Sequence, residues 1–416
     1  KFGPRSIAKP WEDRRLSTYA YFRDKGGRSL EPRDAKGSLR PLEVARAVKH
    51  LIPSTSSGLP FLVKKRQVLD RLNEQSLQAL LSRLDPCVLF TRTQEGGKTR
   101  DVWGFPIAET LFEQTYFQPL LRMRQRLTIQ RAALLGPDAV EFALFDLLGR
   151  AKRSDATVVS IDFSQYDATC QPRLTEPALR TLLSYFQGWD ESRERLIERF
   201  CNIGIVTPDG VLSGPHGVPS GSTFTNEVDS QVQMMIADES GSSEYMTVQG
   251  DDGVHVTHSP SELEDCFESF GLVVNRAKSH KSGCEAIYLQ NFFHVDDLVN
   301  DRGPIRCKGV YPTYRALNRI VHMERWTDLD QDLSGDDFFA IRTISILENC
   351  KRHPMFESLV KFVAQHDRNS LNYSDSGLRA FISKVADKGR AGILHQWSEN
   401  VKGLASFETV RVLKGL

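Results

Sequence analysis

The sequence predicts an α+β fold, in which a small antiparallel sheet is backed by helices. Strand-favouring residues mark 156–161 and the two arms of 247–256. Apolar residues at helical spacing mark the segments between and after these strands. The resulting order of strand, helices, loop and helix, hairpin, helix and strand suits an antiparallel sheet covered by helices.

The first part of the chain predicts an arm followed by short helices. Residues 1–40 are rich in Arg, Lys, Gly and Pro and indicate an extended or loosely folded arm. Residues 54–61 form a loop of small residues whose backbone can approach a ligand closely, and a plain loop explains them equally well. Apolar spacing predicts helices over 42–52, 62–72, 74–84 and 108–131.

A glycine turn between two strand-like pieces carries three cations within residues 88–105. Arg92, Lys98 and Arg100 lie in or beside the turn at Gly96-Gly97. Fixed cations beside glycines suit a triphosphate. Lys98 also follows a glycine as in a P-loop, but the first glycine of that motif would fall at Arg92, which excludes a P-loop NTPase.

Two carboxylates follow the strand of 156–161. Asp162 ends this strand and Asp167 follows five residues later, at the end of a strand where ligands gather. Helices are predicted over 176–187 and 190–203.

A Gly/Pro/Ser loop over 213–226 then enters another helix. Its hydroxyl residues can donate to a phosphate or a sugar. Simple N-capping by Ser220 or Ser222 explains them as well.

A predicted hairpin over 247–256 carries the adjacent carboxylates Asp251 and Asp252. Asp252-Gly253 is a hairpin dipeptide, so we expect the turn there, with both carboxylates at its tip. Two neighbouring carboxylates repel each other, and hard oxygen ligands of this kind suit Mg²⁺ or Mn²⁺. An ordinary polar turn explains the tripeptide when it is taken alone.

The remainder of the chain is predicted to be mainly helical. A capping box at 259–262 starts a helix that Gly271 ends, a short strand follows at 272–274, and 286–294 favours a further hairpin strand. From about 310 to 416 the pattern is mostly helical.

The composition is that of a globular protein of two or three domains or one multi-lobed enzyme, with 416 residues of which 40% are hydrophobic. Seven cysteines without a Cys-x-x-Cys argue against a disulfide framework and a zinc ribbon, and fit a reducing compartment. No apolar run is long enough to span a bilayer, so we expect no membrane partner.

The charges are distributed unevenly along the chain. Residues 1–153 hold 28 Lys and Arg against 16 Asp and Glu, whereas residues 154–416 hold 26 against 37. A basic first lobe beside an acidic second one suggests a polyanion partner together with a metal site, and a solvated basic surface is the plain alternative.

Taken together, three motifs resemble motifs A, B and C of viral RNA-dependent RNA polymerases in their order. They are Asp162-x-x-x-x-Asp167, Ser220-Gly221-x-x-x-Thr225 and Gly250-Asp251-Asp252. Arg92, Lys98 and Arg100 resemble motif F, and residues 57–60 resemble motif G. Residues 275–278 resemble motif D, and the strand at 286–294 lies where motif E is expected. The amino-acid sequences at 217–225 and 309–318 are most similar to those of picobirnavirus enzymes, with partitivirus enzymes as near neighbours.

The resemblance implies a right hand with fingers, palm and mostly helical thumb. It divides the chain into an N-terminal extension at 1–50, fingers at 51–155 with an insertion at 176–212, a palm at 156–175 and 213–305, and a thumb at 306–416.

It also implies RNA-directed nucleotidyl transfer with two Mg²⁺ ions, which Mn²⁺ can replace, held by Asp162, Asp251 and Asp252. Lys278 is implied as the acid for the leaving pyrophosphate, with Lys281 competing. The implied nucleotide-binding residues are Arg92, Lys98, Arg100, Asp167, Ser220, Gly221, Thr225 and Asn226. The implied RNA-binding residues are Ser57, Gly58 and Pro60.

One departure from the family pattern concerns the ribose. Many members place an asparagine four residues after the motif B threonine, where this chain has Asp229, while Asn226 directly follows Thr225. Either residue could therefore read the 2′-hydroxyl.

The partners implied are an RNA template, nascent RNA, ribonucleoside triphosphates and a viral capsid protein, in the virion interior and the host cytoplasm. The implied role is genome replication and transcription. Two alternatives are a reverse transcriptase-like polymerase, which would usually carry an aromatic residue in place of Asp167, and a non-catalytic RNA-binding protein, for which the ordered carboxylates would have no purpose.

Overall fold

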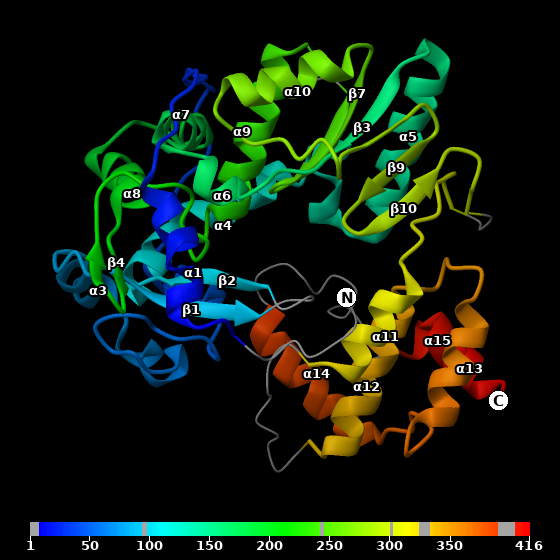
Figure 1. Ribbon diagram of the computed structural model, residues 1–416. Coiled ribbons are helices and arrows are strands. Elements are labelled where there is room, and N and C mark those ends of the chain that lie inside the picture. Colours follow the sequence, from blue (N-terminus) through cyan, green and yellow to red (C-terminus); the bar gives the residue numbers. More distant parts are fainter. Residues whose placement is uncertain (1–7, 94–97, 242–244, 300–302, 324–332, 390–403) are drawn as a thin grey trace.

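A computed structural model describes residues 8–93, 98–241, 245–299, 303–323, 333–389 and 404–416 (Figure 1). Gly96 and Gly97 of the expected glycine turn lie outside these residues. Within the described ranges, no helix is both long enough and apolar enough to cross a membrane.

A four-stranded antiparallel sheet forms the centre of the molecule. Its strands, in the order β6-β7-β3-β8, are Met246–Gln249, Asp252–Thr257, Thr157–Ile161 and His280–Ser282. Side chains alternate between its two faces, so that Val158 and Val159 enter different hydrophobic clusters. The sheet is therefore buried on both sides.

Helices cover both faces of this central sheet (Figure 1). Three helices, α7 (Pro172–Leu183), α9 (Thr225–Glu239) and α10 (Pro260–Ser269), pack on the face that carries Val159. The other face packs against α5 (Pro137–Ser154) and the hairpin of β9 (Glu285–Tyr288) and β10 (Asn291–His294). These layers confirm the predicted α+β class.

A second four-stranded sheet is formed mainly by strands from the first half of the chain. It pairs β2 (Thr99–Gly104), β1 (Cys87–Thr93), β4 (Ile205–Thr207) and β5 (Gly210–Leu212) in that order. Helices α2 (Val44–Ala47), α3 (Glu74–Leu81) and α4 (Ile107–Arg124) share a separate hydrophobic cluster. Helices α6 (Tyr166–Thr169) and α8 (Glu191–Asn202) contribute side chains to the central core.

The C-terminal part has a hydrophobic core of its own. It is built from α11 (Thr313–Val321), α12 (Gly335–Glu348), α13 (Phe356–His366), α14 (Asp375–Gly389) and α15 (Glu408–Lys414). The mostly helical pattern predicted from about residue 310 is present. The boundaries assigned above to fingers, palm and thumb stay a prediction.

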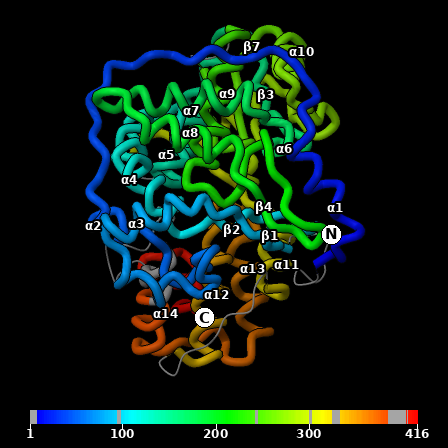
Figure 2. The backbone as a smooth tube through the Cα atoms, turned by 90° about the vertical axis from the view of Figure 1, so that its left-hand side faces the viewer, coloured from blue at the N-terminus to red at the C-terminus, as the bar shows by residue number. Residues whose placement is uncertain are grey.

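The arm at residues 1–40 is not loose where the structure describes it. After α1 (Trp11–Tyr19), residues 23–43 run as an extended strap along the outer edge of the molecule (Figure 2). Backbone N–H groups of Arg28, Leu30 and Ser38 donate to the carbonyls of Ser269 (2.8 Å), Arg173 (3.2 Å) and Tyr185 (2.8 Å). Leu30 is buried in the central core. The strap thus joins segments that lie far apart in the sequence.

Several predicted elements differ from those observed. Residues 62–72 form only 3₁₀ turns at Lys65–Gln67 and Leu69–Arg71, because the Lys65 N–H bonds back to the Thr55 carbonyl (2.8 Å) rather than along a helix.

Other differences concern where elements start and stop. The helix predicted from 176 begins at Pro172, which is favourable in a first helical turn, and the one predicted over 108–131 ends at Arg124. Residues 272–274 provide only an isolated bridge between Phe163 and Val274.

Candidate active site

The strand register brings the predicted catalytic carboxylates together at one end of the central sheet. Ile161 pairs with Gly253 across β3 and β7, so the next residues along, Asp162 and Asp252, lie side by side. Asp251 immediately precedes Asp252 in the β6–β7 turn.

The hairpin turn lies two residues earlier than predicted. Gln249 pairs with Asp252, so the turn residues are Gly250 and Asp251, and Asp252 already begins β7. Gly250 has a φ of 66°, which glycine adopts without steric cost. The prediction of an Asp252-Gly253 turn is therefore wrong, and only Asp251 is at the tip.

The carboxylates of the site disfavour one another's ionisation. The pKa of Asp252 is raised to about 7, because neighbouring protein atoms desolvate it and because Asp251 and Asp162 are negative. The pKa of Asp167 is raised to about 6 by burial and then by Asp251. Burial, Asp167 and Asp251 raise the pKa of Asp229 well above its ordinary value.

This donor set fits a divalent cation. Asp251 and Asp252 are exposed, so an ion from solvent can reach them, and a cation would relieve the repulsion that raises their neighbours' pKa values. Carboxylate oxygens are the ligands that Mg²⁺ and Mn²⁺ prefer.

Helix α9 holds the β6–β7 turn from behind. The Gly250 N–H donates to Ser230 Oγ (2.8 Å), and Gln233 Nε2 donates to the carbonyls of Gly250 (3.1 Å) and Asp251 (3.2 Å). A Cβ at Gly253 would lie 1.7 Å from Gln233 Oε1, which explains the glycine at this position. Ser230 and Gln233 were not predicted, although their i,i+3 spacing on a predicted helix was a signal.

A buried ion triad fixes α9 to α4 and to β6. Glu227 accepts from Arg124 (3.1 Å) and from Arg131, and its side chain is only 2% exposed. Arg131 also donates to the Val248 carbonyl (2.8 Å) and to Asn226 Oδ1 (3.2 Å). The Asn226 amide oxygen is therefore used within the protein.

The predicted motif B residues hold their loop against β2. Ser220 Oγ donates to the Asp101 carbonyl (3.1 Å), and Thr225 Oγ1 donates to the Pro219 carbonyl (2.9 Å). A Cβ at Gly221 would lie 1.6 Å from the Trp103 carbonyl oxygen, so only glycine fits. Nucleotide binding by these residues stays a prediction.

The predicted cations reach the same region from the second sheet. Arg92 and Arg100 are paired across β1 and β2, and Lys98 immediately precedes β2; all three are exposed. The positive charge of Arg100 lowers the pKa of both Asp167 and Asp252, so the guanidinium lies close to the carboxylates. An exposed cationic edge beside a carboxylate site suits a triphosphate held by metal ions.

The structure favours Lys278 over Lys281 as the predicted acid. Lys278 lies in the turn that follows Asn275, and the Asn275 N–H donates to the Asp162 carbonyl (2.7 Å). Lys281 Nζ is instead paired with the buried Glu264 (2.7 Å).

The loop of Ser57, Gly58 and Pro60 packs against the start of α4. Ser57 is fully buried, its carbonyl accepts from the Ile107 N–H (2.7 Å), and a Cβ at Gly58 would lie 2.3 Å from the Phe105 carbonyl. RNA binding by this loop stays a prediction, and the buried Ser57 side chain is not free to make it in this conformation.

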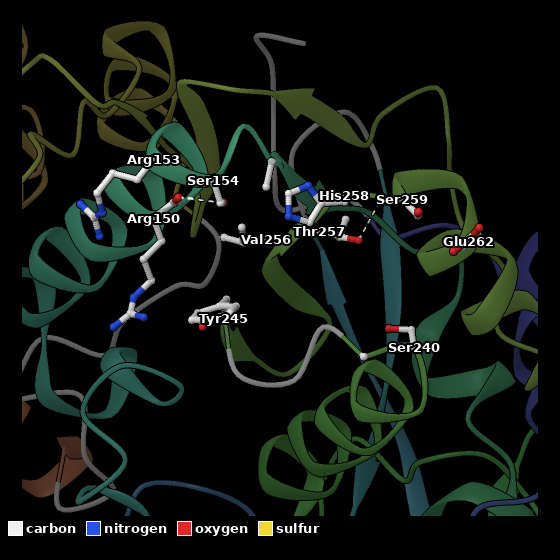
Figure 3. A pocket seen from close by; sticks show the side chains of 12 residues that line it. Arg150, Arg153, Ser154, Ser240, Tyr245, Val256, Thr257, His258, Ser259 and Glu262 are labelled. Atoms are coloured by element: carbon white, nitrogen blue, oxygen red, sulfur yellow. Dashed lines mark hydrogen bonds between the residues drawn. The ribbon is translucent and has the colours of Figure 1, made fainter.

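A pocket outside the carboxylate site lies at the other end of the sheet (Figure 3). It has a volume of about 620 Å³ and is lined by Val256 and Thr257, at the end of β7 remote from Asp252. Arg150 lies over the Tyr245 ring at 5.0 Å. None of its lining residues belongs to the predicted site, so the carboxylate site and this pocket are separate.

Comparison with known proteins defines the class. The family model of viral RNA-dependent RNA polymerases matches residues 31–308. The chain therefore belongs to this family: it is an RNA-directed RNA polymerase with a right-hand fold, and its substrates are RNA and nucleotides. Enzymes of the family generally use divalent metal ions, which fits the carboxylates above.

Two viral RNA polymerases are among its relatives. The chain is 28% identical over 447 residues to the potential RNA-dependent RNA polymerase of human picobirnavirus (strain Human/Thailand/Hy005102/-), covering 94% of this chain and 79% of the relative. It is 26% identical over 316 residues to the RNA-directed RNA polymerase of Cryptosporidium parvum virus 1 (strain KSU-1), covering 68% and 57%.

The fold is similar to a solved picobirnavirus structure. The crystal structure of the RNA-dependent RNA polymerase of a human picobirnavirus superposes with a TM-score of 0.81 at 25% identity, covering 100% of this chain and 86% of the other. The resemblance to picobirnavirus enzymes predicted from the motifs is thereby confirmed.

The raised pKa of Asp252 predicts a pH-dependent difference between the metal-free wild type and Asp252→Asn. Below the ordinary carboxyl pKa of 3.8 both side chains are neutral and we expect similar melting temperatures. As pH rises through about 7, Asp252 ionises at a cost, so the wild type becomes the less stable of the two. Thermal melts in EDTA across this range measure the difference, and Mg²⁺ should stabilise the wild type more. A difference in melting temperature that does not change with pH would contradict a raised pKa of Asp252 caused by the neighbouring carboxylates.

Lys98→Ala and Arg100→Ala should raise the KM for nucleotide more than the Kd for RNA, since Arg100 is beside the carboxylates and Lys98 lies two residues before it on the same sheet edge. Loss of a charged hydrogen bond costs about 1.5–3 kcal/mol, or roughly 10–100-fold in KM. Steady-state kinetics and filter binding separate the two effects. Arg122→Ala, at an exposed position of α4, is the control. Lost RNA affinity with an unchanged KM would refute the assignment.

Proposed function

We propose that the chain replicates and transcribes a viral RNA genome by template-directed transfer of ribonucleotides with two Mg²⁺ ions, which Mn²⁺ can replace. The observation that carries the proposal is the meeting of Asp162 with Asp251 and Asp252 at the end of two paired strands, beside Arg100. These carboxylates repel one another, are open to solvent and lie next to the cationic edge of the second sheet. Such a cluster is suited to hold metal ions and a triphosphate.

Each residue of the site has a role in this proposal. Asp162, Asp251 and Asp252 hold the two ions, which when bound supply charge stabilisation at the attacking 3′-oxygen and the leaving pyrophosphate. Arg92, Lys98 and Arg100 hold the triphosphate in position. Lys278 gives its proton to the leaving pyrophosphate.

The test is incorporation of labelled nucleotides on a single-stranded RNA template. We expect incorporation with Mg²⁺ or Mn²⁺, none in EDTA, and products complementary to the template. Activity that persists in EDTA would refute the metal mechanism, and inactivity on every RNA template with either ion would refute the proposed reaction.

Asp229, rather than Asn226, is proposed to read the ribose together with Asp167. Asn226 Oδ1 is engaged by Arg131, whereas Asp229 Oδ1 is buried without a hydrogen-bond partner in the described structure. The charges of Asp167 and Asp251 both act on Asp229, so its carboxyl lies near theirs.

Asp167→Ala and Asp229→Ala should therefore raise the use of deoxynucleotides relative to ribonucleotides. Loss of one buried hydrogen bond to the sugar costs about 1–3 kcal/mol. The ratio of kcat/KM for the two nucleotide types is the measurement, and Asn226→Ala should change it less. An unchanged ratio in both aspartate variants would contradict the assignment and would favour a reverse transcriptase-like site with no 2′-hydroxyl contact.

The biological setting proposed is that of a double-stranded RNA virus. The polymerase works on template and nascent RNA in the virion interior and in the host cytoplasm, in contact with the viral capsid protein. The similarity to a picobirnavirus polymerase supports this setting. Co-sedimentation of the polymerase with assembled capsid protein tests the contact, and its absence at physiological salt would count against it.

A further inference from the structure

A cysteine, a glutamate and a histidine meet at the foot of the β9–β10 hairpin, outside the carboxylate site. Glu285 and His294 are directly paired across the two strands, and Cys284 precedes Glu285. One ligand atom from each of Cys284, Glu285 and His294 lies within 4.8 Å of the other two. The arrangement thus follows from strand register rather than from chance proximity on a loop.

The backbone around these side chains is tied down. The Cys284 carbonyl accepts from the Val295 N–H (2.9 Å), which closes the hairpin beyond its last strand pair. Ser282 Oγ accepts from the N–H groups of Cys284 and Glu285, at 3.2 Å each. The three donors are therefore held on backbone that is ordered before any ligand binds.

A fourth donor lies next to the cluster. His280 Nε2, on β8, is 3.3 Å from Glu285 Oε2, and its side chain is 28% exposed. A cation bound at this point would be shared by the Glu285 carboxylate and the His280 imidazole.

The chemistry of the donors selects the metal. Thiolate and imidazole ligands favour Zn²⁺ over Mg²⁺, which prefers oxygen ligands alone. Ligand atoms around tetrahedral zinc lie about 3.3–3.8 Å apart, given the usual bond lengths, so Cys284, Glu285 and His294 need only small side-chain rotations to close on one ion.

Binding also requires two local changes. The Cys284 thiol loses its proton to solvent, as zinc ligation demands. His294 Nδ1 accepts from the Asp296 N–H (3.2 Å), so ligation through Nε2 moves the imidazole proton to Nδ1 and breaks this long bond. The bond is at the surface, where water can replace the lost partner.

We propose that Cys284, Glu285 and His294, with His280 as the fourth donor, form a structural Zn²⁺ site. Such a site would join the β9–β10 hairpin to β8, the edge strand of the central sheet. The hairpin in turn contacts the segment before α11, because Phe292 and Val310 exchange backbone hydrogen bonds of 3.0 and 2.9 Å. Zinc would therefore fix the junction between the sheet that carries the carboxylates and the C-terminal helices.

The test measures zinc directly and needs no polymerase activity. The untagged chain is incubated with Zn²⁺, gel-filtered and analysed for zinc by mass spectrometry, beside Cys284→Ser and His294→Gln. Cys266→Ser, in a partly exposed cysteine on α10, and His258→Gln, at an exposed position after β7, are matched controls. We expect zinc to be retained in stoichiometric amount by the wild type and the controls, and to be lost from the two ligand variants.

A second measurement keeps the proposal testable if a ligand variant fails to fold. Co²⁺ bound to the wild type should show the intense near-ultraviolet absorption of a thiolate ligand, and Zn²⁺ should remove it. Zinc should also raise the melting temperature of the wild type and of the controls. Absence of retained zinc and of the thiolate band in the wild type, or equal zinc in ligand variants and controls, would overturn the proposal.

Discussion

Asp251→Asn should reduce elongation by at least roughly 100-fold, the usual cost of removing one electrostatic contact made in a transition state. The substitution keeps the size of the side chain but removes a charge from the cluster that raises the pKa of Asp167, Asp229 and Asp252. Fewer negative charges hold the metal ions less tightly, so the developing charge on the pyrophosphate is stabilised less.

RNA binding and folding should survive this substitution. Phosphate contacts supply most of the affinity for RNA, and the basic residues of the first lobe are unchanged. Relief of carboxylate repulsion should leave the melting temperature equal or higher. The measurements are single-turnover elongation, RNA affinity and thermal melts, with Asp238→Asn as the control, since Asp238 forms an exposed ion pair with Arg33. Asp252→Asn should lose less activity if it acts through water. A near-normal elongation rate in Asp251→Asn would show that Asp251 is not a metal ligand and that the β6–β7 turn has no catalytic role.

Glu227→Ala should lower the free energy of unfolding by about 3–5 kcal/mol, because it leaves two buried arginines without a counter-charge. Arg124 and Arg131 have side chains only 3% and 0% exposed. The same change frees Arg131, which bonds to Asn226 and to the Val248 carbonyl beside the β6–β7 turn, so elongation should fall as well.

Chemical denaturation of Glu227→Ala and Glu239→Ala compares the loss of a buried ion-pair partner with the loss of an exposed one. Glu239 pairs with Arg28 at the surface, where the loss of an ion pair costs less than about 1 kcal/mol. Glu227→Gln, which keeps an acceptor oxygen, should be intermediate. Equal stability of Glu227→Ala and Glu239→Ala would show that the buried triad does not stabilise the fold.

The positions of the candidate catalytic carboxylates were predictable because they depend on local patterns. A β-branched strand that ends in Asp162 and an acidic pair flanked by strand residues are both visible within a dozen residues. Their meeting depends on the antiparallel pairing of β3 with β7, which the α+β order of elements already favoured.

The register of the hairpin was not predictable, because it is decided by a distant helix. Gly253 is a good turn residue, yet in the structure it is the place where Gln233 of α9 passes too close for a Cβ. The turn falls at Gly250, which Ser230 holds through its N–H. Tertiary contacts therefore overrode the local dipeptide preference.

The ion triad was missed for a different reason. Polar residues such as Arg124 and Glu227 on predicted helices are usually solvated, and a row of arginines over 122–126 was consistent with a phosphate-tracking face. The structure buries Arg124 and leaves Arg122 exposed, so neighbouring members of the row have opposite environments. The sequence alone does not tell the buried arginine from the exposed one, because both are the same residue type on the same helix.

The strap of residues 23–43 has a consequence for synthesis of the chain on the ribosome. Arg28 bonds to Ser269, a partner that is made about 240 residues later. At an elongation rate of about 5–20 residues per second, roughly 10–50 s pass between the two. During that time Leu30 has no core to enter, and the contact that closes the strap is among the most non-local in the fold. The nascent segment is therefore a natural target for chaperones or proteases until α10 has been translated and folded.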